Sequence, residues 1–210
     1  MLASVPQETH IHFEMASFVE QACLQDIIDT VVLRSNSLGM NEQELPNLLG
    51  MLSNSSITLV SDPNPRIAST LDQMRLLYRM LRETPETDGK RRITRLHVHT
   101  LAFQAIMTQR QSTWKNSMSA AAKAALAANR HTCGSSEIQL NNARLLMDES
   151  FSTSIEHGSE RIAFESERPV SCWSEDDVDF CVAPVLVCTQ VVQTVGGGDN
   201  ISSAGLVLQL

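Results

Sequence analysis

The segment Thr194-Val-Gly-Gly-Gly-Asp-Asn-Ile-Ser-Ser-Ala-Gly205 is the most informative stretch of this 210-residue chain. It lies between residues 180–187, whose apolar run predicts a buried strand, and residues 201–210, which have helical spacing. Consecutive glycines let backbone N–H groups converge on one point, and the start of a helix adds the positive end of its dipole. A strand, a glycine loop and a helix in this order favour an anion-binding site suited to phosphate.

The apolar pattern of the rest of the chain alternates between strand and helix. Strands are expected at residues 11–16, 93–103 and 180–187, with a shorter one at 162–164 and a strand or loop at 57–60. Helices are expected at residues 18–34, from Asn41 onward, and at 67–81, 112–130, 138–148 and 201–210. This alternation predicts an α/β fold with a mostly parallel sheet flanked by helices.

The other segments are expected to connect or cover these elements. Residues 37–39 are expected to close the first helical region, and Gly134 is expected to end the alanine-rich helix. Residues 84–92 predict a surface loop, and residues 151–171 are mainly polar and irregular. The alanine run at 120–128 is interpreted as a close-packing helix face rather than a partner site.

The composition argues against several classes of protein. The chain has 24 acidic and 16 basic residues and a net charge of −8, whereas nucleic-acid binding needs a basic face. No run of about 18 apolar residues occurs, so no membrane span is expected. Residues 1–10 lack the basic and apolar regions of a signal peptide, so no targeting signal is expected in this chain. An apolar content of 42% is typical of a globular domain.

The cysteine pattern leaves the redox state open. The five cysteines are Cys23, Cys133, Cys172, Cys181 and Cys188. None forms a C-x-x-C pair, so a zinc knuckle or a thioredoxin motif is not supported. An odd number fits either a reduced protein or one disulfide with free thiols.

Asp199, at the mouth of the glycine loop, has two interpretations. A carboxylate at the start of a helix commonly caps the helix itself. The alternative is that Asp199 accepts the proton of an alcohol that attacks a phosphoryl group.

Two further pairs of polar residues stand near expected element ends. His12 and Glu14 share one face of the first strand, and a strand end of an α/β fold is where ligands gather. A surface salt bridge is the alternative. Asn41 and Glu44 have the spacing of a helix cap with a capping box, with Pro46 tolerable so near the helix start. Carboxylates that act through water are also what a Mg²⁺ site uses.

Histidines alternate at two places, His10 with His12 and His97 with His99. Four histidines at strand spacing are compatible with a metal cluster. The preferred interpretation is that they are strand residues whose rings form hydrogen bonds near the sheet edge.

Five segments in this order resemble the ADP-dependent sugar kinases, and most closely the ADP-specific glucokinases of animals. The resemblance extends from about Val5 to the end of the chain. It rests on Ile11-His-Phe-Glu-Met-Ala-Ser17 (an H-x-E motif), Ser37-Leu-Gly-Met-Asn-Glu-Gln-Glu-Leu45 (N-x-x-E), Arg95-Leu-His-Val-His-Thr-Leu101, Pro184-Val-Leu-Val-Cys188 and Gly196-Gly-Gly-Asp199 (Gly-x-Gly-Asp).

The resemblance implies a ribokinase-like fold and transfer of the β-phosphoryl group of ADP to the 6-hydroxyl of glucose, a step of glycolysis. The products would be AMP and glucose 6-phosphate. Asp199 would be the catalytic base. The N–H groups of Gly196, Gly197 and Gly198, with Val195 beside them, would bind the nucleotide and its transferred phosphoryl group.

The resemblance also implies one Mg²⁺ per active site. Glu14 and Glu44 would hold the ion, partly through water, and Asp199 would also face it. His12 and Asn41 would orient these carboxylates.

One residue departs from the family pattern. Relatives usually carry a bulkier apolar residue where Gly197 stands. An extra glycine costs backbone entropy of roughly 0.5–1 kcal/mol, so we expect a looser loop that still forms the site.

The chain also departs in length, since it corresponds to roughly the C-terminal half of the family. Residues 1–210 are therefore expected to be the C-terminal part of the large nucleotide-binding domain. The first βα units and the small lid domain, which supply most sugar contacts in relatives, would be missing. Lid closure excludes water and completes a kinase site, so a complete glucose site is not expected in this chain.

The resemblance leaves alternatives open. The chain could descend from an ADP-dependent phosphofructokinase, because the sugar-selecting residues lie mostly outside it. It could also be a truncated, non-catalytic product that binds nucleotide or another chain. The expected partners are ADP, AMP and glucose, and a full-length enzyme is expected to be monomeric.

Finally, Cys133 and Cys188 match cysteines in animal relatives that look able to pair near the nucleotide site. A disulfide between them would imply an oxidising compartment, such as the secretory pathway or the endoplasmic reticulum.

Overall fold

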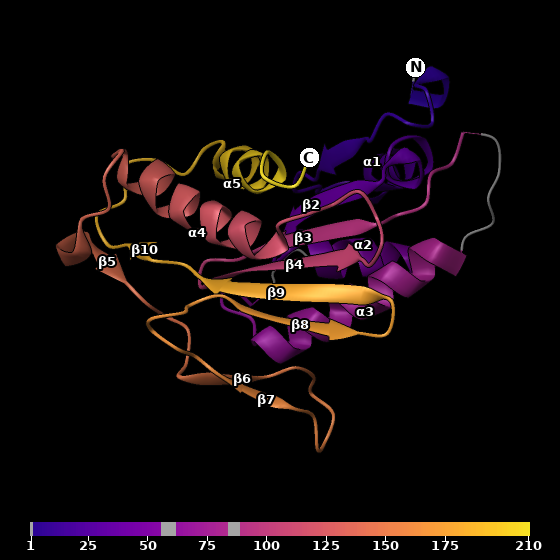
Figure 1. The fold of residues 1–210 in the computed structure, drawn as a ribbon. Coiled ribbons are helices and arrows are strands. Elements are labelled where there is room, and N and C mark those ends of the chain that lie inside the picture. Colours follow the sequence, from indigo (N-terminus) through magenta and orange to yellow (C-terminus); the bar gives the residue numbers. More distant parts are fainter. Residues whose placement is uncertain (1, 56–61, 84–88) are drawn as a thin grey trace.

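A six-stranded sheet with helices on both faces forms the centre of the structure (Figure 1). The computed structural model describes residues 2–55, 62–83 and 89–210. In spatial order the strands are β1 (His12–Glu14), β2 (Ser37–Asn41), β3 (Arg95–His99), β4 (Phe103–Gln109), β9 (Val178–Pro184) and β8 (Ser171–Glu175).

The sheet is mixed. Strands β1, β2 and β3 pair in parallel, whereas β4 is antiparallel to both β3 and β9, and β8 is antiparallel to β9. Strands β1, β2, β3 and β9 therefore run in one direction, and β4 and β8 run in the other. The expected parallel arrangement is found for β1, β2 and β3. The H-x-E motif lies on β1 and the N-x-x-E motif begins at the end of β2, so both motifs are in this parallel part of the sheet.

Helices cover the two faces in separate groups. Helices α1, α2 and α3 pack on one face through the main apolar core, and α4 and α5 cover the other face (Figure 1). No helix in the described ranges is long and apolar enough to cross a membrane. The helices are η1 (Leu2–Ser4), α1 (Gln21–Thr30), η2 (Val32–Arg34), α2 (Glu44–Leu52), α3 (Ile67–Glu83), α4 (Ser117–Cys133), η3 (Leu140–Asn142) and α5 (Gly197–Leu206).

The two faces of the sheet differ in chemistry, because successive strand residues point to opposite sides. The face toward α2 and α3 is apolar and includes Leu38, Met40, Leu96 and Val98, all fully buried. The face toward α5 carries polar side chains at the alternate positions of β1, β2 and β3. The candidate polar residues therefore lie under α5.

The alanine-rich helix α4 allows close approach of its neighbours. Ala120 and Ala124 are fully buried, and a Cβ at Gly205 of α5 would lie 3.5 Å from the Ala120 carbonyl oxygen. Gly134 ends the helix with φ of 61°, a left-handed conformation that glycine adopts without strain. The expected close-packing face and the expected helix end are both confirmed.

Several predicted elements are confirmed with shifted bounds. The helix at 18–34 is α1 followed by η2, the helix at 67–81 is α3, and the strand at 11–16 is β1. The final helix begins earlier than expected, at Gly197, so that Asp199 lies inside its first turn.

Two corrections concern the central sheet. Residues 37–39 do not close a helical region but begin the buried strand β2, because Ser37 and Gly39 face the polar layer under α5 rather than solvent. The strand expected at 93–103 is two strands, β3 and β4, joined by a turn. In this turn Thr100 Oγ1 accepts hydrogen bonds from the N–H groups of Ala102 and Phe103. The sequence pattern did not predict most of β4, nor β8.

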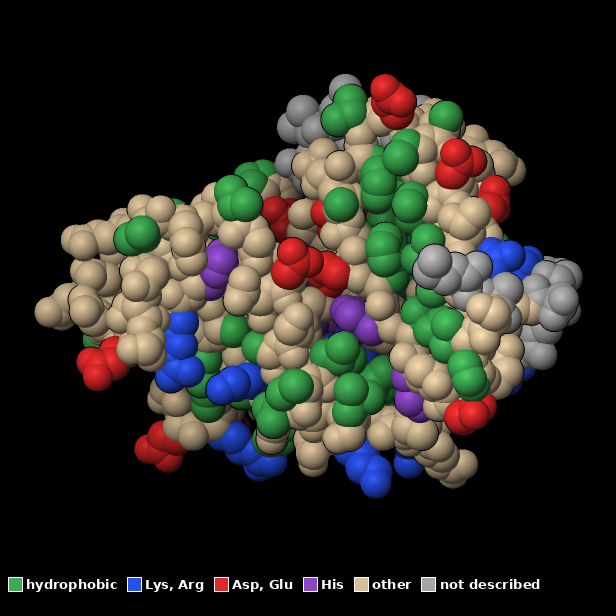
Figure 2. Space-filling view, turned by 90° about the horizontal axis from the view of Figure 1, so that it is seen from above, with side chains coloured by type: hydrophobic (Ala, Val, Ile, Leu, Met, Phe, Trp, Pro, Cys, Tyr) green, Lys and Arg blue, Asp and Glu red, His purple; other side chains and the backbone are tan. Residues whose placement is uncertain are grey.

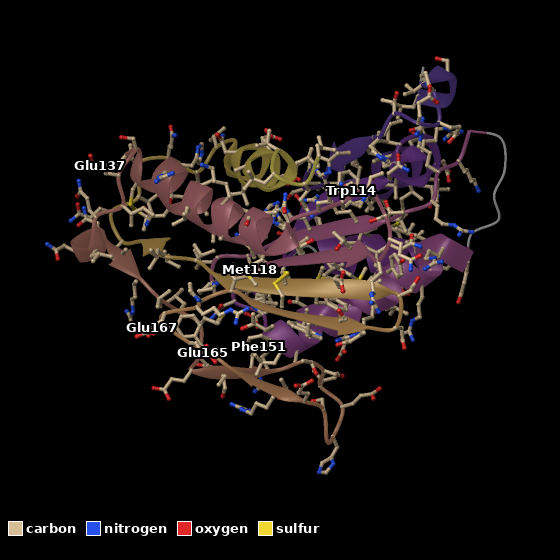
Figure 3. The ribbon with its side chains drawn as sticks, viewed as in Figure 1. Trp114, Met118, Glu137, Phe151, Glu165 and Glu167 are labelled. Atoms are coloured by element: carbon tan, nitrogen blue, oxygen red, sulfur yellow. A yellow bond between two sulfur atoms is a disulfide. The ribbon has the colours of Figure 1, made fainter. Side chains whose placement is uncertain are left out.

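A further correction concerns residues 138–148, which do not form the expected helix. They contain η3 and the strand β5 (Ala143–Arg144), which pairs with β10 (Val187–Cys188). The strand expected at 162–164 is β7 (Arg161–Ala163), paired with β6 (Ser150–Ser152). Phe151 of β6 points toward the central sheet (Figure 3), and its ring centroid lies 6.0 Å from that of Trp173. Residues 57–60 and most of 84–92 lie outside the described residues.

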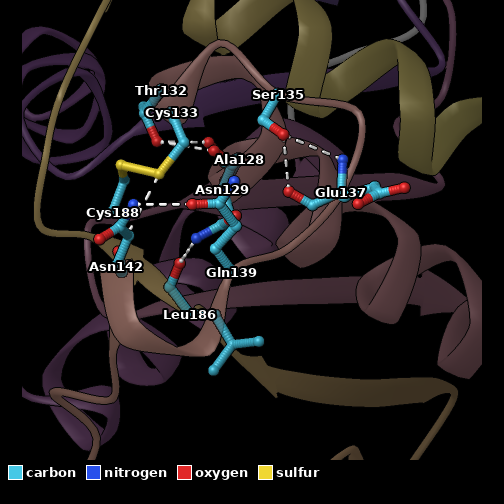
Figure 4. Close-up of a disulfide and its surroundings, with 10 residues drawn as sticks. All are labelled: Ala128, Asn129, Thr132, Cys133, Ser135, Glu137, Gln139, Asn142, Leu186 and Cys188. Atoms are coloured by element: carbon cyan, nitrogen blue, oxygen red, sulfur yellow. Dashed lines mark hydrogen bonds between the residues drawn. A yellow bond between two sulfur atoms is a disulfide. The ribbon is translucent and has the colours of Figure 1, made fainter.

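Two disulfides are present. Cys133–Cys188 joins the end of α4 to β10 (Figure 4), as the family resemblance implied. Cys172–Cys181 joins directly paired residues of β8 and β9, with a Cα–Cα distance of 4.2 Å, and it was not predicted. The odd cysteine count is therefore two disulfides plus the free, exposed Cys23 rather than one disulfide with free thiols.

Phe180 provides a test of the core. Its ring is fully buried, stacks on Trp173 with centroids 5.4 Å apart, and lies 4.9 Å below the Arg75 guanidinium. We expect Phe180→Ala to lower the free energy of unfolding by about 3–5 kcal/mol, measured by urea denaturation, because it leaves a cavity. The control Phe164→Ala, at a partly exposed position outside the core, should cost about 1 kcal/mol or less. Equal losses of unfolding free energy in Phe180→Ala and Phe164→Ala would contradict the assignment of Phe180 to the core.

Candidate functional site

Segments far apart in the sequence meet at one edge of the sheet. Glu14 ends β1, Asn41 ends β2, and Glu44 begins α2. Because β1 and β2 are adjacent and parallel, their carboxyl ends share an edge. Helix α5, which begins at Gly197, packs on β1, β2 and β3. Figure 2 shows acidic and histidine side chains close together near the middle of the face seen from above.

Glu14 is held as a carboxylate by two histidines. His99 Nε2 lies 2.6 Å from Glu14 Oε1, and His12 Nε2 lies 3.7 Å from Oε2. Burial alone would raise the pKa of Glu14, but His12 and His99, which face the carboxylate, outweigh burial and lower this pKa to about 2. Oε2 is buried without a hydrogen-bond partner among the described residues. Glu14 Oε2 can therefore still accept a hydrogen bond or bind a cation.

Gly39 makes room for this carboxylate. A Cβ at position 39 would overlap Glu14 Oε2 and would lie 2.5 Å from Ser202 Oγ. Gly39 pairs directly with Glu14 across β1 and β2. A side chain at this position of β2 would therefore displace the carboxylate from its histidine partners.

A layer of hydrogen bonds continues below Glu14. His12 Nδ1 lies 2.9 Å from Ser37 Oγ, and His12 Nε2 lies 3.0 Å from Ser202 Oγ of α5. Arg95 Nη1 donates to Ser37 Oγ at 2.9 Å, and Arg95 Nε donates to Gln209 Oε1 at 2.6 Å. Full burial lowers the pKa of Arg95 to about 10, which still leaves the guanidinium charged at neutral pH. Residues of α5 and of the segment after it are thus bonded to the sheet beneath the site.

His97 lies in the same layer as a neutral ring. Its Nε2 donates to Gln104 Oε1 at 3.0 Å. Burial and the charge of Arg95 hold the pKa of His97 well below its usual range. His97 and His99 are thus hydrogen-bonded strand residues, and His10 lies 2.7 Å from Thr113 Oγ1. Within the described ranges no three His, Cys, Asp or Glu side chains are placed to hold a metal ion.

The hydrogen bonds of the predicted capping box between Asn41 and Glu44 are present, although Asn41 ends β2 and α2 begins at Glu44, with Gln43 at its cap position. Asn41 Oδ1 accepts hydrogen bonds from the N–H groups of Gln43 and Glu44, each at 2.9 Å. In return, Glu44 Oε2 accepts from the Asn41 N–H at 2.9 Å, and Oε1 accepts from Ser17 Oγ at 3.2 Å. Burial raises the pKa of Glu44, and the charge of Glu14 adds to this rise. The two carboxylates are thus close enough to interact.

The glycine loop packs directly on the Glu14–His99 pair. A Cβ at Gly198 would lie 3.1 Å from Glu14 Oε1 and 3.3 Å from His99 Cε1. Gly196 caps α5 with φ of 73°, and the Gly197 N–H donates to the Thr194 carbonyl at 3.0 Å. Among the residues described, the N–H groups of Gly196, Gly198 and Asp199 meet no acceptor. An anion at this helix end would therefore find free donors beside a fixed carboxylate.

Asp199 and Val195 lie on the outer side of this site. The Asp199 side chain is exposed in the first turn of α5, one residue after the glycine that touches Glu14. Val195 is 91% exposed and directly precedes the glycines. Both side chains are therefore accessible to a ligand bound at the helix end.

Comparison with known proteins identifies the family. Residues 1–208 match the ADP-specific Phosphofructokinase/Glucokinase conserved region. The chain belongs to this family. It is 31% identical over 208 residues to the ADP-dependent glucokinase of Bos taurus, an alignment that covers 98% of this chain and 41% of the bovine protein. It is 28% identical over 218 residues to a probable ADP-dependent glucokinase of Caenorhabditis elegans, covering 98% of this chain and 42% of that protein.

Solved structures show the same fold. The last common ancestor of ADP-dependent phosphofructokinases from Methanosarcinales has a TM-score of 0.61 and 20% identity, covering 95% of this chain and 42% of that one. A phosphofructokinase from Pyrococcus horikoshii OT3 with AMP has a TM-score of 0.58 and 19% identity, covering 96% of this chain and 42% of that one. This member of the ADP-specific phosphofructokinase/glucokinase family thus spans about two fifths of the length of these relatives.

The structure brings most residues of the predicted site together in this family member. Gly198 packs on Glu14, the charge of Glu14 acts on Glu44, and Asp199 follows at the exposed rim. Sequence reasoning did not identify His99 as the partner of Glu14, nor Gly39 as the space for its carboxylate. The alternation of Arg95, His97 and His99 placed them on one strand face, but only the pairing of β1, β2 and β3 shows what they contact.

We expect Gly39→Ala to disturb the site more than the fold. Because the new methyl group would occupy the position of Glu14 Oε2, the hydrogen bond from His99 should be lost. The free energy of unfolding should fall by roughly 1–3 kcal/mol, measured by urea denaturation, as for other overpacked sites. In the background Glu14→Ala/Ser202→Ala, which removes both side chains that the new methyl group would overlap, the added cost of Gly39→Ala should largely disappear. If the cost of Gly39→Ala were the same in both backgrounds, the overlap would not be its cause.

The three glycines of the loop should respond differently to alanine. At Gly197 a Cβ would meet only His131 Cδ2, at 3.8 Å, so Gly197→Ala should raise the free energy of unfolding by about 0.4–1 kcal/mol. Gly196→Ala should lower it by about 1 kcal/mol, because φ of 73° is left-handed. Gly198→Ala should also be destabilising, because the new methyl group would lie too close to Glu14 and His99. Thermal denaturation would compare the stabilities of the three variants. A destabilised Gly197→Ala variant would contradict the expectation of a loosened loop.

Proposed function

We propose that this chain is the nucleotide-binding part of an ADP-dependent glucokinase. The reaction would transfer the β-phosphoryl group of ADP to the 6-hydroxyl of D-glucose and give glucose 6-phosphate and AMP. The observation that carries this proposal is the packing of the N-terminus of α5 on the Glu14–His99 pair, which places free N–H donors beside a fixed carboxylate. The named bovine relative supports glucose as the acceptor.

In this proposal the loop residues act on the transferred phosphoryl group. The N–H groups of Gly196, Gly198 and Asp199 would stabilise the charge that develops on its oxygens. The Gly197 N–H would first have to leave the Thr194 carbonyl to join them. The exposed Asp199 carboxylate would accept the proton of the attacking sugar hydroxyl. The apolar rim at Val192 and Val195, which are 72% and 91% exposed, would face the adenine ring.

Glu14 and Glu44 fit a hard divalent cation such as Mg²⁺. Glu14 is ionised, and its Oε2 is buried without a hydrogen-bond partner among the described residues. The negative charge of Glu14 contributes to the raised pKa of Glu44. Both offer the oxygen ligands that Mg²⁺ prefers, and this ion usually keeps several waters. When bound, the ion would neutralise charge on the phosphates. His99 and Asn41 would keep the two carboxylates in place, with His12 beside Glu14, and Asp199 would complete the acidic edge.

We propose that residues 1–210 form the C-terminal part of a ribokinase-like domain and that other parts of a full-length enzyme supply most glucose contacts. A second candidate is an ADP-dependent phosphofructokinase. It is favoured by the similar fold of a solved ADP-dependent kinase in complex with fructose-6-phosphate and ADPβS, with a TM-score of 0.61. The higher sequence identity to named glucokinases favours the first candidate.

Calorimetry of ADP binding with and without Mg²⁺ tests the nucleotide part of this proposal. We expect the chain to bind ADP in a Mg²⁺-dependent manner. Glu14→Gln and Glu44→Gln should weaken binding in Mg²⁺ by about tenfold or more, since a lost charged contact costs about 1.5–3 kcal/mol. Asp199→Asn should have a smaller effect on binding if its main role is proton transfer.

Glu165→Gln is the matched control, because Glu165 is exposed on the connection after β7, away from α5 (Figure 3). It should bind ADP as the wild type does. Absence of ADP binding by the folded chain, or identical Mg²⁺ dependence in all variants, would contradict the assignment.

A further inference from the structure

The last turn of α4 holds the segment that leads into the glycine loop. Cys133 is joined by a disulfide to Cys188, where this segment begins (Figure 4). The Thr132 carbonyl accepts a hydrogen bond from the Val192 N–H at 2.8 Å. His131 Nε2 lies 2.9 Å from the carbonyl oxygen of Val195, the residue directly before Gly196. Three consecutive helix residues thus hold the segment at its start, middle and end.

The hydrogen-bond partners of His131 define how its ring acts. The Val195 carbonyl can only accept, so His131 Nε2 is the donor. The Gln193 side-chain amide nitrogen, which can only donate, lies 3.4 Å from His131 Nδ1. The ring thus donates from Nε2 to the loop and accepts at Nδ1 from Gln193. The same ring lies against the glycine loop, because a Cβ at Gly197 would be 3.8 Å from His131 Cδ2.

Few other contacts hold the segment near the glycines. Residues 189–196 are exposed, with Val195 at 91%. The other hydrogen bonds of the loop among the described residues are local: the Gly197 N–H donates to the Thr194 carbonyl, and the Asn200 N–H and Nδ2 donate to the Gly196 carbonyl. An exposed segment with few buried contacts opens locally at low free energy. Gly198 lies within α5, but the Gly196 N–H belongs to the same peptide unit as the Val195 carbonyl, so its direction depends on the attachment at Val195.

We propose that His131 is a positioning residue for the anion site at the start of α5. By holding the Val195 carbonyl, it keeps the Gly196 N–H, on the same peptide plane, pointed at the position of the phosphoryl group before nucleotide binds. The identity of the anion as the phosphate of ADP rests on the proposed function, whereas the ordering of the loop by His131 does not. No motif in the sequence indicates this role, since His131 lies about 65 residues before the loop.

Amide hydrogen exchange of the nucleotide-free chain, followed by mass spectrometry, tests the ordering. His131→Ala should speed exchange by about five- to tenfold at the hydrogen-bonded amides of Val192, Gln193 and Gly197, the effect expected for one lost hydrogen bond. His131→Gln can place an amide nitrogen near the position of Nε2 and should keep exchange close to that of the wild type. His157→Ala, an exposed histidine on the β6–β7 connection, is the control and should leave these residues unchanged. The thermal midpoint should be similar in all variants.

Calorimetry with ADP and Mg²⁺ then tests the consequence. If the proposed function holds, His131→Ala should bind ADP about five- to tenfold more weakly, and His131→Gln should restore most of the loss. Unchanged exchange in His131→Ala, or the same increase in His131→Gln, would overturn the positioning role. If exchange responds as expected but the wild type does not bind ADP, the proposed function fails while the ordering role of His131 stands.

Discussion

Glu14 reaches over Gly39 to accept a hydrogen bond from His99, and the geometry of the site depends on this contact between β1 and β3. This contact requires a parallel register in which Gly39 of β2 pairs with Glu14 of β1 on one side and with His97 of β3 on the other. The glycine thus lies between β1 and β3. The contact also requires Gly198 of α5 to approach without a side chain. The carboxylate, its partner and the helix end are thus fixed by one arrangement of three strands and two glycines.

The polar layer under α5 limits where this helix can lie. A purely apolar contact tolerates sliding, because the hydrophobic effect has no preferred direction. Here Ser202 is bonded to His12, and Gln209, just beyond α5, is bonded to Arg95, so a shift along the helix axis would break one partly buried and one fully buried hydrogen bond. Burying Arg95 and His97 is costly, and both retain a nitrogen without a partner among the described residues. The cost is offset elsewhere, since the opposite face of the sheet carries the large apolar core.

The sequence predicted those parts of the fold that depend on local pattern. The helical spacing at 67–81, the alanine-rich helix with its Gly134 end and the capping pair of Asn41 and Glu44 are all found. Strand β2 was missed because Ser37 and Gly39 look like loop residues until the polar layer they face is known. Strand β8 was missed because its alternate positions are half exposed. The contact of His99 with Glu14 joins residues 85 positions apart, and local patterns carry no information about such pairs.

The Cys133–Cys188 disulfide has a consequence for the covalent integrity of the molecule. It closes a loop of 55 residues that contains η3, β5 to β9 and both cysteines of the second disulfide. In the chain-entropy model a loop of this size restricts the unfolded chain by about 4 kcal/mol. Residues 155–158 are the exposed tip inside this loop. A protease that cuts there would produce two fragments that migrate as one species until a reducing agent is added, so the half that carries Glu14 would stay attached to the half that carries the glycine loop.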